Sequence, residues 1–305
     1  MRARLIVNPT ASGVTQKIVA GVVSRLTPVA DLDIAETTGK GHATTLAAEV
    51  AEGAVIALGG DGTFNEVVNG IRPGVAFAPL PGGASSVYAR QLGYPDEPVK
   101  ASSLLARAIA EQSVRSVGLG VTDGRRFTFA ASVGFDADAT RAVDEARRRR
   151  PGNVRPGDLH VLYEAMRALG SQGFRLAEQM TVTTEGSAPL RASYIAIANQ
   201  HPYTYFGKLP VKATPRAGFD SALDAVVLGR LGKRARPRLA LYALVWPRHA
   251  RETTRGITYL HDCHRIGIEC DHPVAVQIDG EYVGVRQRIE VGYEADAVQV
   301  FVPCS

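Results

Sequence analysis

The feature that most constrains this sequence is the segment at residues 59–70, which reads GGDGTFNEVVNG. The apolar run at residues 55–58 leads directly into it, so the pattern predicts a strand, a tight turn and the start of a helix. Three glycines let a ligand approach the bare backbone of the turn, and the N–H groups of the following helix offer an anion site. Asp61 in such a turn suits a site where a metal ion or a reacting hydroxyl lies beside phosphate groups.

Length and composition describe a soluble globular protein of two domains. The chain has 305 residues, which is long for a single hydrophobic core, and it contains 45% hydrophobic and 21% charged residues. No apolar run approaches the length of a membrane span, and residues 5–7 are the only apolar run before Asn8 and Pro9. Neither a transmembrane anchor nor a signal peptide is therefore expected. The three cysteines are an odd number, which favours a reducing cytoplasm.

The net charge of +5 is unevenly distributed along the chain. Residues 230–255 carry eight Lys or Arg and one Glu around an apolar stretch that contains Trp246. This pattern is typical of a surface helix that binds anionic lipid, and equally of a core-facing amphipathic helix with solvated arginines. Both interpretations stay open. The arginine run at residues 147–150 has few aromatics between its charges, so no nucleic-acid partner is expected.

The order of the predicted elements indicates an α/β fold followed by a β-rich domain. Strands are expected at residues 5–7, 31–36, 54–58 and 75–79, and helices at 15–26, 42–52, 64–70 and from about residue 85. Beyond about residue 115, alternating segments are expected as strands at 127–130, 180–183, 194–198, 266–269, 274–278 and 297–302. We predict an α/β domain with a largely parallel sheet at 1–115 and a β-sandwich at 116–305. The second domain has a helical insertion around 137–172, and a return of the last residues to the first domain stays open.

Three familiar motifs do not fit the sequence. Residues 38–43 resemble a Walker A loop, but Gly41 follows Lys40 where Ser or Thr is required, and the upstream glycine is missing. A G-x-G-x-x-G dinucleotide fingerprint is absent. The histidines and cysteines at residues 261–272 lack the spacing of a zinc framework, so no zinc site is expected.

Five motifs occur in order along nearly the whole chain. They are NPTASG at 8–13, TTGKGHA at 37–43, GGDGTFNEVVNG at 59–70, PLPGGASSVYAR at 79–90 and IDGE at 278–281. Together they resemble the diacylglycerol kinase catalytic family, which includes bacterial lipid kinases and sphingosine kinases. GGDG alone also occurs in NAD kinases and phosphofructokinases, whereas the continuation NEVVNG and the late DGE resemble the lipid kinases.

The resemblance implies an N-terminal nucleotide-binding domain of the NAD kinase and phosphofructokinase type, followed by a C-terminal β-sandwich. It implies ATP and Mg²⁺ as cofactors. Nucleotide contacts are expected from Asn8, Pro9, Thr10, Ala11, Ser12, Thr37, Thr38, Gly59, Gly60, Gly62, Thr63, Asn65, Glu66, Gly83 and Ser85. These residues follow predicted strands, where an open α/β sheet binds its ligands.

The resemblance also implies catalytic and metal-binding roles. Glu281 would act as general base on the lipid hydroxyl, and Asp61 would assist through Mg²⁺ or a bound water. Asp220 would bind a structural Mg²⁺, together with the carbonyl group of Leu223. A solvated Asp in a turn is the alternative for Asp220.

One segment departs from the family pattern. Ala84, Ser86 and Val87 stand where the family has Thr, Asn and Asp, and Ser85 is the replacement for the missing nucleotide contact. Sphingosine kinases likewise lack the acid at the last of these positions. The departure makes a catalytically impaired lipid-binding or regulatory pseudo-kinase the main alternative, and a NAD kinase-like enzyme is a third.

The function expected from the sequence is transfer of the γ-phosphate of ATP to a lipid hydroxyl, with diacylglycerol as the acceptor and phosphatidic acid as the product. Such an enzyme of phospholipid metabolism would be cytoplasmic and peripherally associated with the inner face of the membrane, because its substrate lies in the bilayer. A homodimer is left open.

Overall fold

In the computed structural model of the protein, residues 1–148, 177–206, 209–230 and 256–304 are described. The chain divides into two compact units. Unit 1 comprises Met1–Leu119 and Glu294–Ser305, and unit 2 comprises Gly120–Tyr293. Most of the basic segment 230–255, half of the arginine run 147–150 and most of the predicted helical insertion lie outside the described residues.

Unit 1 contains a parallel sheet in the order β4-β3-β1-β2. Its strands are β1 (Arg2–Val7), β2 (Asp31–Glu36), β3 (Ala54–Gly59) and β4 (Ala76–Pro81). Every residue of β3 and β4 is buried, which explains their continuous apolar sequence. The end of β16 (Glu281–Phe301) adds a further parallel strand, because Gln299 and Val300 pair with Ala76 and Phe77. The predicted α/β character and largely parallel sheet are therefore confirmed.

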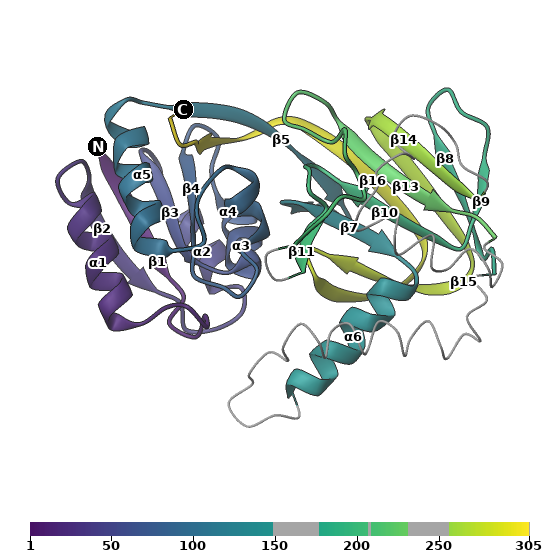
Figure 1. The fold of residues 1–305 in the computed structure, drawn as a ribbon, viewed down its shortest axis with the longest axis horizontal. Helices are drawn as coiled ribbons and strands as arrows, with labels where there is room; N and C mark the ends of the chain where they lie inside the picture. Colours follow the sequence, from purple (N-terminus) through teal and green to yellow (C-terminus); the bar gives the residue numbers. More distant parts are fainter. Residues whose placement is uncertain (149–176, 207–208, 231–255, 305) are drawn as a thin grey trace. The chain divides into compact units, whose positions relative to one another are not determined.

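In unit 1, one helix follows each of the first three strands and two helices follow β4 (Figure 1). They are α1 (Gln16–Leu26), α2 (His42–Ala48), α3 (Asp61–Gly70), α4 (Val87–Gln91) and α5 (Pro98–Ala110). The Thr15 hydroxyl accepts the N–H of Ile18 and so caps α1. The expected start of α3 at residue 64 was wrong by one turn, because extended Gly60 is its N-cap and the helix includes Asp61. The expected end of α2 at residue 52 was also late, since the helix ends at Ala48.

Unit 2 consists mainly of antiparallel strands, several of them longer than expected. Strands β5 (Val114–Thr122) and β16 (Glu281–Phe301) each run across the boundary between the units. The other strands are β6 (Arg125–Phe127), β7 (Ala130–Val133), β8 (Met180–Thr184), β9 (Leu190–Ala192), β10 (Tyr194–Ala198), β11 (Thr204–Phe206), β12 (Leu209–Val211), β13 (Leu223–Leu228), β14 (Ile257–Cys263) and β15 (Arg265–Ile278). The pairing order β14-β13-β10-β7-β15-β16 is antiparallel throughout, which confirms the β-rich second half.

The core of unit 2 is built from alternate residues of its strands. Ile266 and Ile268 of β15, and Ile195 and Ile197 of β10, are buried in one hydrophobic cluster. This alternation is the period of a strand, and it was the sequence signal for the second half of the chain. Helix α6 (Phe135–Arg148) follows β7 and carries two acidic residues in its first turn, where negative charge favours a helix.

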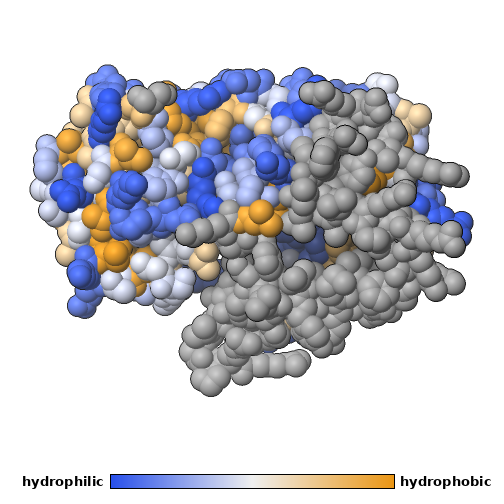
Figure 2. Space-filling model, viewed as in Figure 1, coloured by the Kyte–Doolittle hydropathy of each residue, from blue (hydrophilic) through white to orange (hydrophobic). Residues whose placement is uncertain are grey.

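The surface of the described residues carries few large hydrophobic side chains. They are Met1, Ile34, Val114, Leu209 and Val285. Figure 2 shows hydrophobic residues in small groups among hydrophilic ones on the face that it draws. None of the helices in the described ranges combines the length and the apolar character that a membrane crossing requires.

Candidate functional site

Unit 1 places the predicted nucleotide residues at one edge of its sheet. Residues 8–12 follow β1, residues 37–38 follow β2, residues 60–66 follow β3 and residues 83–85 follow β4. These strands are parallel, so their carboxyl ends lie at the same edge. That edge is where open α/β sheets bind ligands.

The loops after β3 and β4 approach each other backbone to backbone. The N–H of Gly82 donates to the carbonyl of Gly59 at 2.7 Å, and the N–H of Gly13 donates to the carbonyl of Gly82 at 2.8 Å. A Cβ atom on Gly83 would lie 2.6 Å from the Cα atom of Gly60, closer than any real side chain lies. The close approach therefore requires glycine, and it leaves a stretch of backbone without side chains beside the start of α3.

Asn8 fixes the first turn of α3 from the end of β1. Its Nδ2 group donates to the hydroxyl of Thr63 at 2.9 Å, and its Oδ1 accepts from the N–H and hydroxyl of Thr10 at 3.1 and 2.9 Å. The side chain thus holds two of the predicted nucleotide loops in a defined relation. Ser12, by contrast, is exposed and takes no part in these hydrogen bonds.

Asp61 is the first residue of α3 and is half-buried. Its Oδ1 accepts the N–H of Tyr88 in α4 at 3.1 Å. The segment that departs from the family pattern lies just before this contact. Ser86 has a left-handed φ of 43° and its hydroxyl lies 3.3 Å from the N–H of Gly83, while Val87 is buried at 1% exposure. Val87 therefore packs in the interior and offers nothing polar to a ligand.

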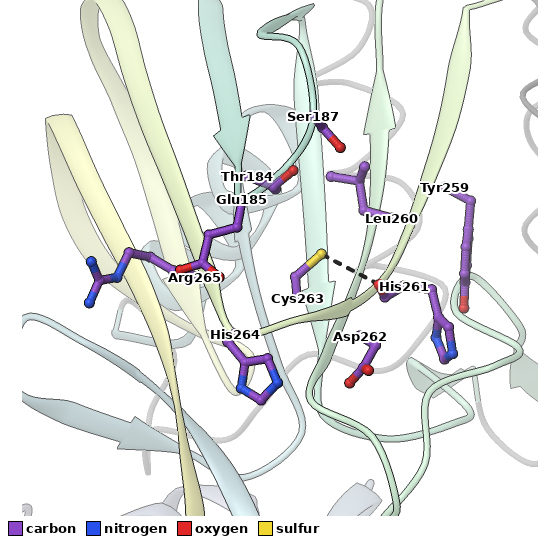
Figure 3. A pocket seen from close by; sticks show the side chains of 10 residues that line it. All are labelled: Thr184, Glu185, Ser187, Tyr259, Leu260, His261, Asp262, Cys263, His264 and Arg265. Carbon is purple, nitrogen blue, oxygen red and sulfur yellow. Dashed lines mark hydrogen bonds between the residues drawn. The ribbon is translucent and has the colours of Figure 1, made fainter.

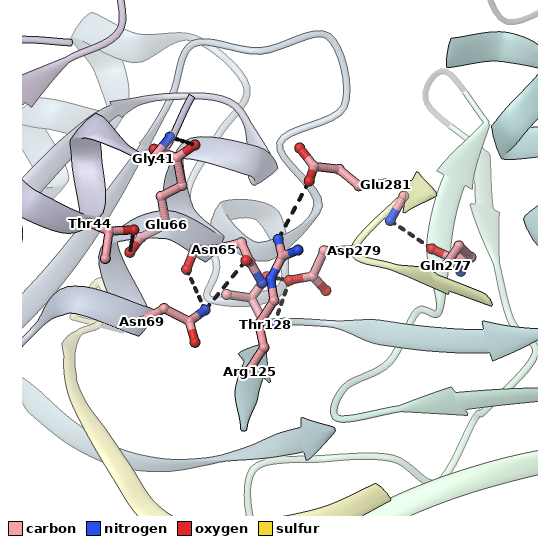
Figure 4. A network of polar contacts seen from close by, with 11 residues as sticks. Gly41, Thr44, Asn65, Glu66, Asn69, Arg125, Thr128, Gln277, Asp279 and Glu281 are labelled. Atoms are coloured by element: carbon pink, nitrogen blue, oxygen red, sulfur yellow. Dashed lines mark hydrogen bonds and ion pairs between the residues drawn. The ribbon is translucent and has the colours of Figure 1, made fainter. Parts of the chain in front are cut away.

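Glu66 holds the loop between β2 and α2, as the left part of Figure 4 shows. Its two carboxylate oxygens accept the N–H groups of Gly41 at 2.8 Å and Ala43 at 3.1 Å, at the start of α2. The hydroxyl of Thr44 donates to the Glu66 carbonyl at 2.9 Å. Asn65 beside it is buried and accepts from Asn69. Glu66 thus has a structural partner in addition to its predicted place in the nucleotide site.

In unit 2 the DGE motif forms a tight hairpin turn between β15 and β16 (Figure 4). Asp279 and Gly280 are its central residues, with φ of 47° and 74°, and Ile278 pairs with Glu281. The buried Asp279 carboxylate accepts the N–H and hydroxyl of Thr128 at 2.7 and 2.8 Å, and the N–H groups of residues 129 and 130 at 2.9 and 3.1 Å. Burial raises the pKa of Asp279, and these hydrogen bonds oppose the rise.

Glu281 begins β16 at the end of this turn. Its side chain is 31% exposed, and its Oε2 lies 3.5 Å from Nη2 of Arg125, which is 33% exposed. The predicted base is thus a carboxylate on a well-fixed turn, reachable from solvent and oriented by a cation. Arg125, which the motifs did not point to, lies only three residues before Thr128, which binds Asp279.

Asp136 was also missed by the sequence analysis. It lies in the first turn of α6, where its Oδ2 accepts the hydroxyls of Tyr194 at 2.9 Å and Tyr203 at 3.3 Å, and its Oδ1 accepts the hydroxyl of Ser132. Burial raises the pKa of Asp136 to about 6, against the effect of these three hydroxyls. Its one sequence signal is the acidic first turn of a helix, which is common and carries no chemistry by itself.

Of the two predicted metal ligands, Asp220 precedes β13 (Leu223–Leu228) and Leu223 begins it. Asp220 is exposed in the turn before the strand, whereas Leu223 is buried as its first residue. Within the described ranges, no three or more His, Cys, Asp or Glu side chains are grouped so that they could hold a metal ion. The buried carboxylate of this region is Asp224, which accepts from Tyr259, from Nδ1 of His261 at 2.7 Å and from a backbone N–H.

A pocket of about 390 Å³ opens beside the β14–β15 turn in unit 2 (Figure 3). It is lined by residues 259–265, by Thr184 and Glu185 at the end of β8, and by Ser187. Burial, with nearby acidic groups, raises the pKa of the Cys263 thiol to about 11. The thiol therefore stays protonated at neutral pH.

Comparisons with known proteins point to one family. Residues 2–120 match the family model of the diacylglycerol kinase catalytic domain. A "Diacylglycerol kinase" of Bacillus subtilis (strain 168) is 34% identical over 162 residues, which are 50% of this chain and 52% of that protein. A "Probable lipid kinase YegS-like" of Chromohalobacter salexigens is 35% identical over 122 residues, 37% of each chain. The chain thus matches about half or less of the length of these relatives.

The fold extends the similarity beyond the matched sequence. A crystal structure of a diacylglycerol kinase from Bacillus anthracis str. Sterne superposes with a TM-score of 0.72 over 99% of this chain and 96% of that chain, at 19% sequence identity. At this identity the likeness concerns the fold, a parallel N-terminal sheet followed by antiparallel strands. The match over residues 2–120 confirms the resemblance to the diacylglycerol kinase catalytic domain family that the ordered motifs predicted.

Proposed function

We propose that the protein is an ATP-dependent lipid kinase, a phosphotransferase with an alcohol group as acceptor. The γ-phosphate of ATP passes to the hydroxyl of diacylglycerol and gives phosphatidic acid. The observation that carries the proposal is the bare glycine backbone at the ends of β3 and β4, beside which α3 begins with Asp61. This backbone lies within the residues that match the kinase family, whose members use ATP.

The residues at this edge fit the phosphates of a nucleotide. Side chains are missing where Gly60 and Gly83 face each other, so a phosphate can reach the backbone N–H groups directly. The ten-residue helix α3 adds the partial positive charge of its N-terminus. Asn8 and Thr63 hold the loop in place, which reduces the ordering needed when ATP binds.

The residues fit Mg²⁺ as an ion that arrives with the nucleotide. Asp61 supplies one carboxylate beside the phosphate site, and Mg²⁺ commonly takes one or two carboxylates, waters and substrate phosphates. Bound there, the ion would neutralise charge on the phosphates. A second, structural Mg²⁺ at Asp220 and the Leu223 carbonyl stays a prediction, resting on one exposed carboxylate.

Glu281 is the proposed general base. Its carboxylate takes the proton of the lipid hydroxyl as that oxygen bonds to the γ-phosphorus and the bond to the ADP oxygen breaks. Two features support the role: the carboxylate is partly open to solvent, and it is held by a fixed turn and by Arg125.

The remaining parts of the proposal concern the lipid side. Unit 2 would be the β-sandwich that receives the acceptor, and the enzyme would work in the cytoplasm, peripherally bound to the inner face of the membrane. Support comes from the insolubility of diacylglycerol and from the basic segment at residues 230–255. Assembly into a homodimer stays a prediction.

A pseudo-kinase is the second candidate function, and one observation favours it. Val87, at the position of the family's Asp, is packed in the interior, and the Ser86 hydroxyl is engaged with Gly83. Neither residue offers the missing carboxylate or amide. A protein of this kind would bind ATP or lipid without transferring phosphate.

A labelled-phosphate assay separates these functions. The protein is incubated with γ-labelled ATP and Mg²⁺, with diacylglycerol, sphingosine or ceramide in mixed micelles, or with NAD in solution. Label in diacylglycerol supports the proposal, and label in another lipid changes the acceptor. Label in NAD alone supports a NAD kinase-like enzyme, while ATP binding in calorimetry without transfer supports the pseudo-kinase.

A further inference from the structure

We propose that Gln277, Tyr203 and Asp136 form a hydrogen-bonded chain that positions the turn carrying Glu281, and that they are positioning residues for phosphoryl transfer. The inference rests on the proposed role of Glu281 as base. The three residues come from β15, from the segment just before β11 and from the start of α6, so only the folded unit brings them together.

Gln277 closes the turn from within. Its Oε1 accepts the N–H of Gly280 at 2.8 Å, and its Nε2 donates to the hydroxyl oxygen of Tyr203 at 3.2 Å (Figure 4 shows the first of these bonds). The side chain is only 5% exposed, so water competes poorly for either bond. Gly280 immediately precedes Glu281, and the amide therefore acts on the backbone next to the proposed base.

The turn needs this support because the pairing beside it is irregular. Val276 pairs with Gly284 but Gln277 pairs with Tyr282, so β16 contains one extra residue, Val283, two positions after Glu281. Such bulges redirect a strand and the side chains beside it. A hydrogen bond across the turn limits the directions that the Glu281 backbone can take.

Asp136 sets the donor-to-acceptor direction of every hydrogen bond in this series. Its carboxylate is acceptor only, so the Tyr203 hydroxyl donates to it, at 3.3 Å, and keeps its own lone pairs for a donor. The NH₂ group of Gln277 fills that place, which turns the Gln277 carbonyl toward the N–H of Gly280. A flipped amide would set NH₂ against N–H at the turn.

Tyr194 provides a matched control. Its hydroxyl donates to the same Asp136 oxygen as the Tyr203 hydroxyl, at 2.9 Å, and both side chains are buried. Among the described contacts, only the Tyr203 hydroxyl accepts a hydrogen bond from Gln277. Tyr203→Phe breaks the chain at its middle, whereas Tyr194→Phe removes an equivalent phenol beside it. Gln277→Leu removes the link to the turn at similar side-chain volume.

The experiment measures lipid phosphorylation and amide hydrogen exchange in the full-length protein and these three variants. We expect Tyr203→Phe and Gln277→Leu to lower kcat about tenfold with the KM for ATP unchanged, because a small displacement of a reacting group is costly. Exchange at residues 277–282 should become faster in both. Tyr194→Phe should change kcat less than about twofold and leave this exchange unchanged.

Each other outcome has a definite meaning. Equal effects of the two tyrosine variants on kcat and exchange would overturn the inference, and so would faster exchange with an unchanged kcat. If the unmodified protein transfers no phosphate, the proposed function fails. The exchange data then decide separately: unchanged exchange in Tyr203→Phe overturns the hydrogen-bonded chain, and faster exchange confined to that variant and Gln277→Leu supports it.

Discussion

The substitution Asp279→Asn tests how much of the stability of unit 2 depends on one buried carboxylate. Asp279 is 5% exposed and accepts four hydrogen bonds of 2.7 to 3.1 Å from residues 128–130. Its φ of 47° lies in the left-handed region, which asparagine adopts readily. The exchange therefore keeps the backbone and the size of the side chain and changes only its hydrogen bonding and its charge.

The magnitude follows from the four donors. Asparagine keeps one oxygen and replaces the other by NH₂. Two of the four donor groups of residues 128–130 then face this NH₂ group, which is itself a donor and cannot accept their hydrogen bonds. A buried donor without a partner costs about 1–3 kcal/mol, which gives about 2–6 kcal/mol for two. Part of this free-energy cost is recovered, because burying a neutral amide costs less than burying a carboxylate. Burial already disfavours the charged form of Asp279, since it raises the pKa of that group. We expect a net loss of about 2–3 kcal/mol in the free energy of unfolding.

Urea unfolding monitored by circular dichroism measures this loss. Asp271→Asn is the matched control, because the Asp271 carboxylate pairs with Arg191 at 2.6 Å but is 55% exposed. Water and salt screen an exposed ion pair, so it contributes little to stability. The reasoning is refuted if Asp279→Asn costs no more than Asp271→Asn.

Three further substitutions have defined outcomes. Gly60→Ala should weaken ATP binding at least about tenfold at unchanged Tm. The added Cβ meets nothing nearer than the Gly83 Cα atom at 3.4 Å in the protein, but it would crowd the backbone N–H groups proposed to bind phosphate. Calorimetry with Gly292→Ala as control checks this, and intact binding contradicts it. Gly83→Ala should cost about 1–3 kcal/mol of stability, because its Cβ would lie 2.6 Å from backbone, and an unchanged denaturation midpoint would contradict it. The pKa of Asp136 rises from 3.8 to about 6 on folding, so its protonated form adds about 3 kcal/mol of stability below pH 3.8 that is lost as the pH rises through about 6. Between pH 4 and pH 7, the free energy of unfolding of the unmodified protein should fall relative to that of Asp136→Asn. Parallel pH profiles of the two proteins would contradict this prediction.

The N-terminal half of the fold was largely readable from the sequence. Strands β3 and β4 are short apolar runs that end at Gly59 and Pro81, and such end signals are local in the sequence. The start of α3 was misplaced because Asp61 and Gly62 look like turn residues, whereas the extended Gly60 already caps the helix. Helix α5 has no counterpart among the expected elements, although Glu97 caps it and Pro98 begins it.

The candidate site was readable only where it is encoded in contiguous motifs. The glycine loop after β3 was predicted to bind phosphate from its own residues, whereas the loop after β4 was assigned to the nucleotide only by the resemblance. The structure brings the two loops into backbone contact. Glu281 was singled out by resemblance alone, since a D-G-E turn is otherwise an ordinary hairpin. The partners that fix that turn are far away in sequence: Thr128 lies 151 residues from Asp279, and Tyr203 lies 74 from Gln277. No local pattern encodes such pairs.

The central claim is that this chain phosphorylates a lipid with Glu281 as the base. The most direct test compares the rate of labelled-phosphate transfer from ATP to diacylglycerol for the unmodified protein, Glu281→Gln and Arg125→Ala. We predict transfer by the unmodified protein and a loss of about 100-fold or more in Glu281→Gln, with a smaller loss in Arg125→Ala, which breaks the same ion pair but leaves the base. Equal rates in the unmodified protein and Glu281→Gln, or no transfer by the unmodified protein, would contradict the claim.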